Sequence, residues 1–199
     1  MSFHPSMDYG RGHHKSARAL PEDGPAFEYS RENRAKLEEI CAGYPTDQRK
    51  SAILAALYLV QHQQGYITLN GMRHVAEVIG CTPADVEDVV SFYTMFYTRP
   101  VGRYVLQVCR TLSCALMGAE RDTEELSKTL GIAPGETDQK GEFTLFEVEC
   151  LGACDRAPVV GVNDHWHECQ KPEDAGALVT ALRTKGPGAL TGCYLKVEK

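Results

Sequence analysis

The sequence FTLFEVECLGACDRAPVVGV, residues 143–162, decides the fold of the second half of the chain. Residues 143–148 alternate in side-chain character and predict a strand. Cys150 and Cys154 follow directly, and residues 158–162 predict another strand. Two cysteines therefore lie in a tight loop between two predicted strands.

A matching segment lies upstream of this loop. Residues 104–108 predict a strand, and Cys109 and Cys114 follow it. Ser113 is a candidate cap for a helix over about residues 114–130. Further along come a loop at 131–141, a turn at Asn163-Asp164, a strand at 165–169 and a helix that begins at Pro172. This order of strands and helices indicates a compact thioredoxin-like sandwich.

The first half of the chain predicts four helices with short connections. Ser30, Thr46 and Thr82 are candidate caps of three of them, and another helix covers about residues 71–79. The apolar run Ala52–Val60 places the second helix at the centre of a small bundle.

The predicted fold class is therefore α+β: an N-terminal helical bundle followed by a thioredoxin-like α/β domain. Residues 1–29 are rich in glycine and proline and predict a flexible lead-in. The remaining predicted parts are the helical bundle at 30–98, the thioredoxin-like domain at 99–185 and a C-terminal tail at 186–199.

Composition excludes several function classes. The formal net charge of -6 is unfavourable for nucleic acid, because phosphate binding needs a basic face. The longest apolar run is too short for a membrane span, which needs about 20 residues. The sequence thus predicts neither nucleic-acid binding nor direct membrane insertion. We expect a reducing, cytosol-like compartment, where clustered cysteines indicate metal or redox chemistry rather than disulfides.

The four paired cysteines are the candidate site. Four residues separate Cys109 from Cys114, and three separate Cys150 from Cys154. Each pair follows a predicted strand, and both strand ends can face the same edge of the domain. Small and turn-forming residues around the pairs allow backbone N–H groups to approach the sulfurs, as iron–sulfur clusters require.

Other interpretations of these cysteines stay open at this point. A structural zinc site with four cysteine ligands is one, although the two gaps together fit zinc less well. Four unrelated reduced thiols are another. A thioredoxin-type dithiol enzyme is disfavoured because no Cys-x-x-Cys occurs. The four remaining cysteines are interpreted as small hydrophobic residues outside the site: Cys41, Cys81, Cys169 and Cys193. His165 and His167 are also left out, because neither is paired in motif with the cysteines as Rieske ligands would be.

The cysteine motifs resemble a known family. Val108-Cys109-x4-Cys114 with Gly118, Glu149 to Cys154 with Ala157-Pro158, and Val162-Asn163-Asp164 are similar to the thioredoxin-like iron–sulfur subunit of NADH–quinone oxidoreductase, the respiratory complex I of bacteria. The upstream helices, with Gln64-Gly65-Tyr66-Ile67 and Ser91 to Phe96, resemble that family too. The strand at 165–168, His-Trp-His-Glu, departs from the tyrosine-rich version expected.

The resemblance implies one [2Fe–2S] cluster per chain, bound by Cys109, Cys114, Cys150 and Cys154. It also implies an electron-transfer subunit of an enzyme complex, packed beside the flavin- and NADH-binding subunit and a neighbouring iron–sulfur subunit. The location it implies is cytoplasmic, in the peripheral arm attached to the cytoplasmic face of the inner membrane. The chain has no Gly-x-Gly-x-x-Gly segment, so we expect no NADH or flavin site of its own.

Two alternatives to this role stay open, because other enzyme complexes use similar subunits and because four cysteines can also bind zinc. One is the diaphorase subunit of an NAD-linked hydrogenase or formate dehydrogenase. The other is a structural four-cysteine zinc module. A freestanding ferredoxin is disfavoured, because it would not need the helical half.

Overall fold

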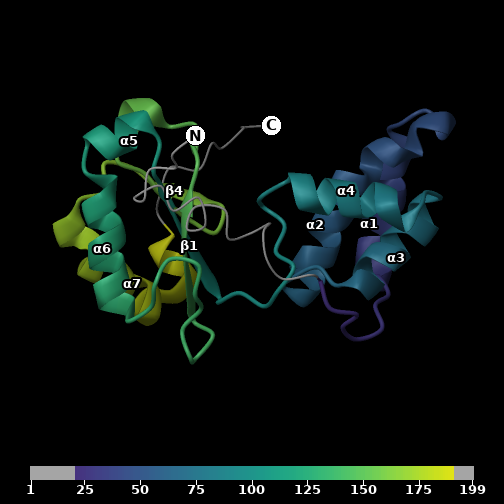
Figure 1. Ribbon diagram of the computed structural model, residues 1–199. Coiled ribbons are helices and arrows are strands. Elements are labelled where there is room, and N and C mark those ends of the chain that lie inside the picture. The colour runs from purple at the N-terminus through teal and green to yellow at the C-terminus, as the bar shows by residue number, and fades with distance from the viewer. Residues whose placement is uncertain (1–20, 191–199) are drawn as a thin grey trace, which may run out of the picture. The chain divides into compact units, whose positions relative to one another are not determined.

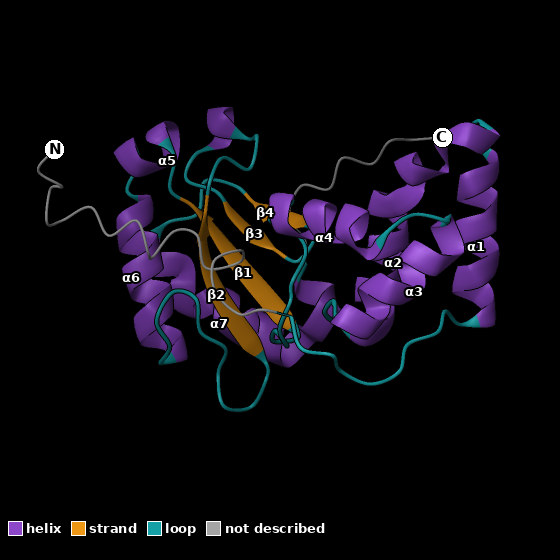
Figure 2. Cartoon of the chain, turned by 45° about the vertical axis from the view of Figure 1, so that its right-hand side comes forward, coloured by secondary structure: helices purple, strands orange, loops and turns teal. Residues whose placement is uncertain are grey.

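The computed structural model describes residues 21–190, which form two compact units that divide after Pro100 (Figure 1). The first unit is helical, and the second is built around a sheet (Figure 2). No described helix in either unit is long and apolar enough to cross a bilayer.

The helical unit follows the predicted order closely. Its elements are α1 (Arg31–Ala42), η1 (Thr46–Ala52), α2 (Ile53–Gln64), α3 (Leu69–Ile79) and α4 (Pro83–Phe92). Ser30 caps α1 by accepting the N–H of Asn33, and Thr82 forms a reciprocal capping box with Asp85 at the start of α4. Both predicted caps are confirmed, because side-chain oxygens satisfy the first free N–H groups of each helix.

Two predicted helix starts were wrong. Thr46 begins a 3-10 segment, η1, and the α-helix starts only at Ile53; Gln48 is non-helical inside η1. The third helix begins at Leu69, because Thr68 caps it by accepting the N–H of Gly71. Short segments of 3-10 geometry are common next to α-helix ends, and hydrophobic periodicity does not reveal them.

The second helix forms the centre of the helical core, as predicted. It packs against α1, η1, α3 and α4. Ala56, Leu57 and Val60 on α2 have no exposed surface. A helix enclosed by neighbours on several sides must be apolar over most of its circumference, which explains the run Ala52–Val60.

Residues 21–29 do not form the flexible segment that their composition predicted. Phe27 and Tyr29 are buried in the helical core, and the Tyr29 hydroxyl donates to the carbonyl of Ala56 at 2.9 Å. Two isolated aromatic residues provide no periodicity, so their burial could not be predicted from the pattern. Residues 1–20 of the predicted lead-in lie outside the described residues.

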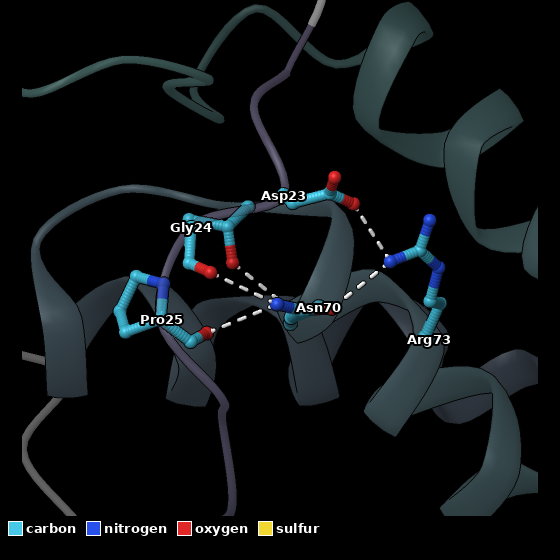
Figure 3. Close-up of polar contacts among 7 residues, drawn as sticks. Asp23, Gly24, Pro25, Asn70 and Arg73 are labelled. Atoms are coloured by element: carbon cyan, nitrogen blue, oxygen red, sulfur yellow. Dashed lines mark hydrogen bonds and ion pairs between the residues drawn. The ribbon is translucent and has the colours of Figure 1, made fainter.

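The same segment is also fastened to the start of α3 by polar contacts (Figure 3). The Asn70 side-chain amide donates to the carbonyls of Gly24 at 2.9 Å and Pro25 at 3.3 Å. Its oxygen accepts from Arg73, which also pairs with Asp23 at 2.8 Å. The Asn70 side chain therefore joins an extended segment to the first turn of a helix.

Replacing this amide tests the attachment. Asn70→Asp is expected to lower the free energy of unfolding by about 1 kcal/mol, because a carboxylate cannot donate to the two carbonyls. Asn70→Ala removes the donor without adding a charge and should cost less. Urea unfolding of the two variants measures the difference; equal midpoints for both variants and the unmodified protein would contradict the assignment.

The second unit contains a four-stranded sheet in the order β2-β1-β3-β4. The strands are β1 (Tyr104–Cys109), β2 (Phe143–Val148), β3 (Val160–Val162) and β4 (His165–His167). β1 runs parallel to β2, while β3 is antiparallel to both β1 and β4. The mixed sheet and its helices confirm the predicted fold class.

The helices of this unit are α5 (Leu112–Leu116), α6 (Ala119–Leu130) and α7 (Ala175–Lys185), with short 3-10 segments η2 (Cys154–Arg156), η3 (Pro172–Asp174) and η4 (Gly186–Ala189). Figures 1 and 2 show α6 and α7 side by side against the sheet. Their buried residues share one core with Leu106, Val108 and Leu145 of the strands. The apolar stripe predicted for the last helix, which includes Leu178 and Leu182, faces this core.

Three predicted details of this unit were wrong. The predicted helix at 114–130 is two helices, because Gly118 at φ +100° is in the left-handed region, where helices end. Its first part begins after Thr111 rather than Ser113. Cys169 does not end a strand: its φ of +52° lies outside the strand region.

The first residues of the predicted C-terminal tail are part of the folded unit. Residues 186–189 form η4, which packs against α7 and buries Ala189. Residues 191–199, which include Cys193, lie outside the described residues.

A buried carboxyl group lies on α6. Asp122 is 1% exposed, and neither of its carboxyl oxygens has a hydrogen-bond partner among the described residues. Burial, with smaller contributions from Glu173 and Asp174, raises the pKa of Asp122 from 3.8 to about 6. The proton therefore binds more tightly to the folded chain than to the unfolded chain.

This raised pKa predicts that stability falls as pH rises. The contribution from Asp122 is fully present below pH 3.8 and is lost as pH passes through about 6. Between pH 5 and pH 8 the loss is roughly 1 kcal/mol. We expect Asp122→Asn to remove this pH-dependent part, measured as the difference in unfolding free energy between variant and unmodified protein. Thr123→Val, a buried and uncharged neighbour, should give a pH-independent difference; the same constancy for Asp122→Asn would contradict the prediction.

Candidate functional site

The sheet brings the two cysteine pairs to the same end of the second unit. Cys109 is the last residue of β1 and lies opposite Val148, the last residue of β2. Because these two strands are parallel, the segments that follow them leave from the same edge. The N–H of Arg110 donates to the carbonyl of Val148 at 3.0 Å, which extends the pairing into the loops. The predicted common edge is confirmed.

The first cysteine pair is buried. Cys109 and Cys114 are each 2% exposed and belong to the core of the sheet unit. Cys114 lies on α5. The Cys109 sulfur lies 3.2 Å from the hydroxyl oxygen of Thr111. The N–H of Cys109 donates to the carbonyl of Val159 at 3.1 Å, which ties this pair to the segment before β3.

The second cysteine pair is exposed. The sulfurs of Cys150 and Cys154 lie 3.3 Å apart, and both residues are exposed. The N–H of Gly152 donates to the Cys150 sulfur at 3.3 Å. The short turn between the two cysteines therefore brings both sulfurs close together and supplies a backbone N–H donor to one of them.

The segments that carry the two cysteine pairs are in contact, because α5, which holds Cys114, packs against η2, which begins at Cys154. The backbone N–H of Leu151, from the second loop, is close enough to the Cys109 sulfur to lower the pKa of that thiol. The N–H of Val159 acts in the same direction on the pKa of Cys114. One residue within the second pair and one residue after it thus affect the sulfurs of the first pair.

The thiols affect one another's protonation. Burial raises the pKa of Cys114 to about 11, and Cys109 and Cys154 add to the rise. Burial also raises the pKa of Cys109, but hydrogen bonds from Thr111 and Leu151 outweigh it, so its pKa lies below the ordinary value. A hydrogen bond with Cys150 raises the pKa of Cys154. Cys109 makes a smaller contribution to the raised pKa of Cys154.

This set of donors fits an iron–sulfur cluster. Four thiols, one end of a sheet and several N–H groups directed at sulfur are the combination that such clusters need. Within residues 21–190, no three or more His, Cys, Asp or Glu side chains form a group that could hold a metal ion in the present side-chain positions. Loss of the thiol protons accompanies metal binding to cysteine.

The residues left out of the site lie in other positions. Cys41 is buried in the helical core, Cys81 is half-buried and Cys169 is exposed. His165 and His167 are on β4, the edge strand separated from β2 by β1 and β3.

The sequence did not predict the specific donors. The contacts from the Thr111 hydroxyl and from the N–H groups of Leu151 and Val159 were missed. Only the position of Thr111, two residues after a cysteine, was a usable signal.

A comparison with protein families decides the relationship. The model of the thioredoxin-like [2Fe-2S] ferredoxin family matches residues 37–183. The chain belongs to the thioredoxin-like [2Fe–2S] ferredoxin family. Its cofactor is a [2Fe–2S] cluster, and the predicted resemblance is confirmed. The match begins within the helical unit and continues through α7, so membership in this [2Fe–2S] family covers both units.

Curated relatives of this [2Fe–2S] protein carry the names of subunits of one enzyme complex. NADH-quinone oxidoreductase subunit 2 of Thermus thermophilus is 45% identical over 148 residues, which are 74% of this chain and 82% of the relative. An NADH-quinone oxidoreductase subunit of Mycobacterium tuberculosis is 42% identical over 173 residues, 85% of this chain and 68% of the relative. The corresponding subunit of Rhizobium meliloti is 43% identical over 150 residues, 75% of this chain and 88% of the relative.

A solved structure shares the fold. The crystal structure of an NAD+-reducing [NiFe]-hydrogenase in the H2-reduced state matches with a TM-score of 0.59 at 18% identity. The match covers 68% of this [2Fe–2S] protein and 23% of the hydrogenase chain. At this identity the likeness concerns the fold alone.

Proposed function

We propose that this chain is the electron-transfer subunit of an NADH–quinone oxidoreductase, and that Cys109, Cys114, Cys150 and Cys154 bind its single [2Fe–2S] cluster. The observation that carries the ligand assignment is the packing of α5, which holds Cys114, against η2, which begins at Cys154. These two elements follow different strands, and their contact supports one site for both cysteine pairs. The relatives at 42–45% identity support the parent complex.

The protein residues supply ligation, burial and hydrogen bonds. When bound, a [2Fe–2S] cluster takes up and gives back one electron at a time. Cys109 and Cys114 hold the buried side of the site, while Cys150 and Cys154 hold the side open to the surface. The N–H groups of Gly152, Leu151 and Val159 stabilise negative charge on the sulfurs.

The exposed side of the site is where we place the partner. Next to Cys114, Leu112 and Leu116 of α5 and the following residue, Met117, have exposed fractions of 74%, 78% and 62%. Exposed apolar side chains grouped in this way are typical of contact surfaces between proteins. We propose that the flavin- and NADH-binding subunit covers this surface, so that electrons pass between the partner's flavin and the site. The proposal includes a second partner, a neighbouring iron–sulfur subunit of the same complex. It places the chain in the cytoplasmic, peripheral arm of that complex.

Purification from the native host tests the parent complex. An affinity tag on this chain should retain a flavin-containing subunit, together with NADH:quinone reductase activity. Recovery of hydrogenase or formate dehydrogenase catalytic subunits instead would move the chain to the alternative parent complex. A colourless chain with one zinc would overturn the electron-transfer role altogether.

A further inference from the structure

Thr111 makes a side-chain contact with one of the proposed ligands. Its hydroxyl oxygen lies 3.2 Å from the Cys109 sulfur, and its own N–H is directed at the same atom. Sulfur–oxygen contacts of this length are hydrogen bonds when one atom carries a hydrogen. In a free thiol either atom can donate. A cysteine that binds iron has lost its proton, so the Thr111 hydroxyl must then be the donor.

The position of Thr111 in the fold is unusual for this contact. Thr111 occupies the N-cap of α5, where a threonine side chain ordinarily accepts an N–H from the first turn. In this structure its side chain makes no such capping bond. The hydroxyl is directed at Cys109 instead, although capping would be the expected local arrangement.

We propose that Thr111 is a positioning residue that sets the reduction potential of the cluster through a hydrogen bond to Cys109. This inference rests on the proposed ligand role of Cys109. The reduced site carries one more negative charge than the oxidised site. A hydrogen bond to a ligand sulfur therefore stabilises the reduced form more, and its presence raises the potential.

The test compares variants of the full chain loaded with its cluster. Thr111→Val keeps the shape of the side chain and removes the donor, whereas Thr111→Ser keeps the hydroxyl. Dithionite supplies the electrons in a mediated redox titration, and the low-temperature electron spin resonance signal of the reduced form reports the midpoint. We expect Thr111→Val to make reduction about tenfold less favourable, a shift of about 59 mV to lower potential for one electron. Thr111→Ser should restore most of the difference.

A matched variant controls for the substitution itself. Thr137→Val makes the same change at a hydroxyl that contacts Thr144 at 2.8 Å, in the loop before β2. It should leave the midpoint unchanged. Iron content of each variant is measured alongside the titration. Thr111→Ala provides a second donor-free variant if Thr111→Val holds no iron.

The outcomes separate this inference from the proposed function. A loaded donor-free variant with the unmodified midpoint overturns the role of Thr111 but leaves the ligand assignment intact. Loss of iron from both donor-free variants also overturns it, because the hydroxyl would then retain the cluster rather than set its potential. Absence of a [2Fe–2S] signal from the unmodified protein instead overturns the proposed function.

Discussion

Cys114→Ala is expected to leave the purified protein without its [2Fe–2S] cluster, with iron falling from about two per chain to near zero. The Cys114 sulfur is buried, and it is enclosed by the N–H of Val159 and the sulfur of Cys109. A nearby replacement ligand would have to enter the core of the sheet unit. Cys150→Ala, on the exposed side, should lose the cluster as well. Iron and acid-labile sulfide analysis measures both.

Cys41→Ala is the matched control, because Cys41 is 3% exposed and Cys114 is 2% exposed. It removes an equally buried sulfur from the helical core and should leave the iron content unchanged. Cys193→Ala should also keep the cluster. Equal iron in all four variants would mean that the ligands were assigned wrongly.

Gly102→Ala is the second change with a large expected effect. A Cβ atom at this position would lie 2.6–2.8 Å from three backbone atoms of Phe143, closer than real contacts allow. Those atoms belong to the start of β2 and cannot rotate away. The N–H of Gly102 also donates to the Thr144 hydroxyl at 2.6 Å. We expect the free energy of unfolding of the sheet unit to fall by about 3 kcal/mol.

Gly176→Ala is the control for this glycine substitution. Gly176 lies in the first turn of α7, and an added Cβ would meet no heavy atom within 4 Å. Alanine there should raise stability by up to about 1 kcal/mol, because it has the higher helix propensity. Urea unfolding curves of the two variants provide the comparison. A Gly102→Ala protein as stable as Gly176→Ala would show that β2 can shift at little cost.

The parts of the fold that follow from periodicity and turn chemistry could be predicted. The strands before Cys109 and Cys150 are apolar and bounded by clear turns, so their common edge followed from the fold class. The break at Gly118 could not, because a single glycine is also compatible with a continuous helix. The burial of Phe27 and Tyr29 depends on partners far along the chain, such as Ala56.

In the candidate site, the proposed ligands could likewise be predicted from local sequence, whereas the hydrogen-bond donors to their sulfurs depend on the fold. The spacing of the cysteines, together with the family resemblance, was enough to nominate four ligands. The donors to their sulfurs depend on how two distant loops meet. The packing of these loops also determines whether the Thr111 hydroxyl caps α5 or contacts Cys109. Neither the donors to sulfur nor the orientation of the Thr111 hydroxyl can be predicted from the residues adjacent in the sequence.

The pairing of β1 with strands on both sides has a consequence for how the protein is made. Its partner β2 precedes Cys150 in the chain, but its other partner, β3, ends at Val162, after both cysteine pairs. During synthesis, the chain therefore has no complete scaffold around the four thiols until residue 162 has left the ribosome. We expect iron delivery to follow translation of β3, with the thiols of the nascent protein exposed to oxidants until then.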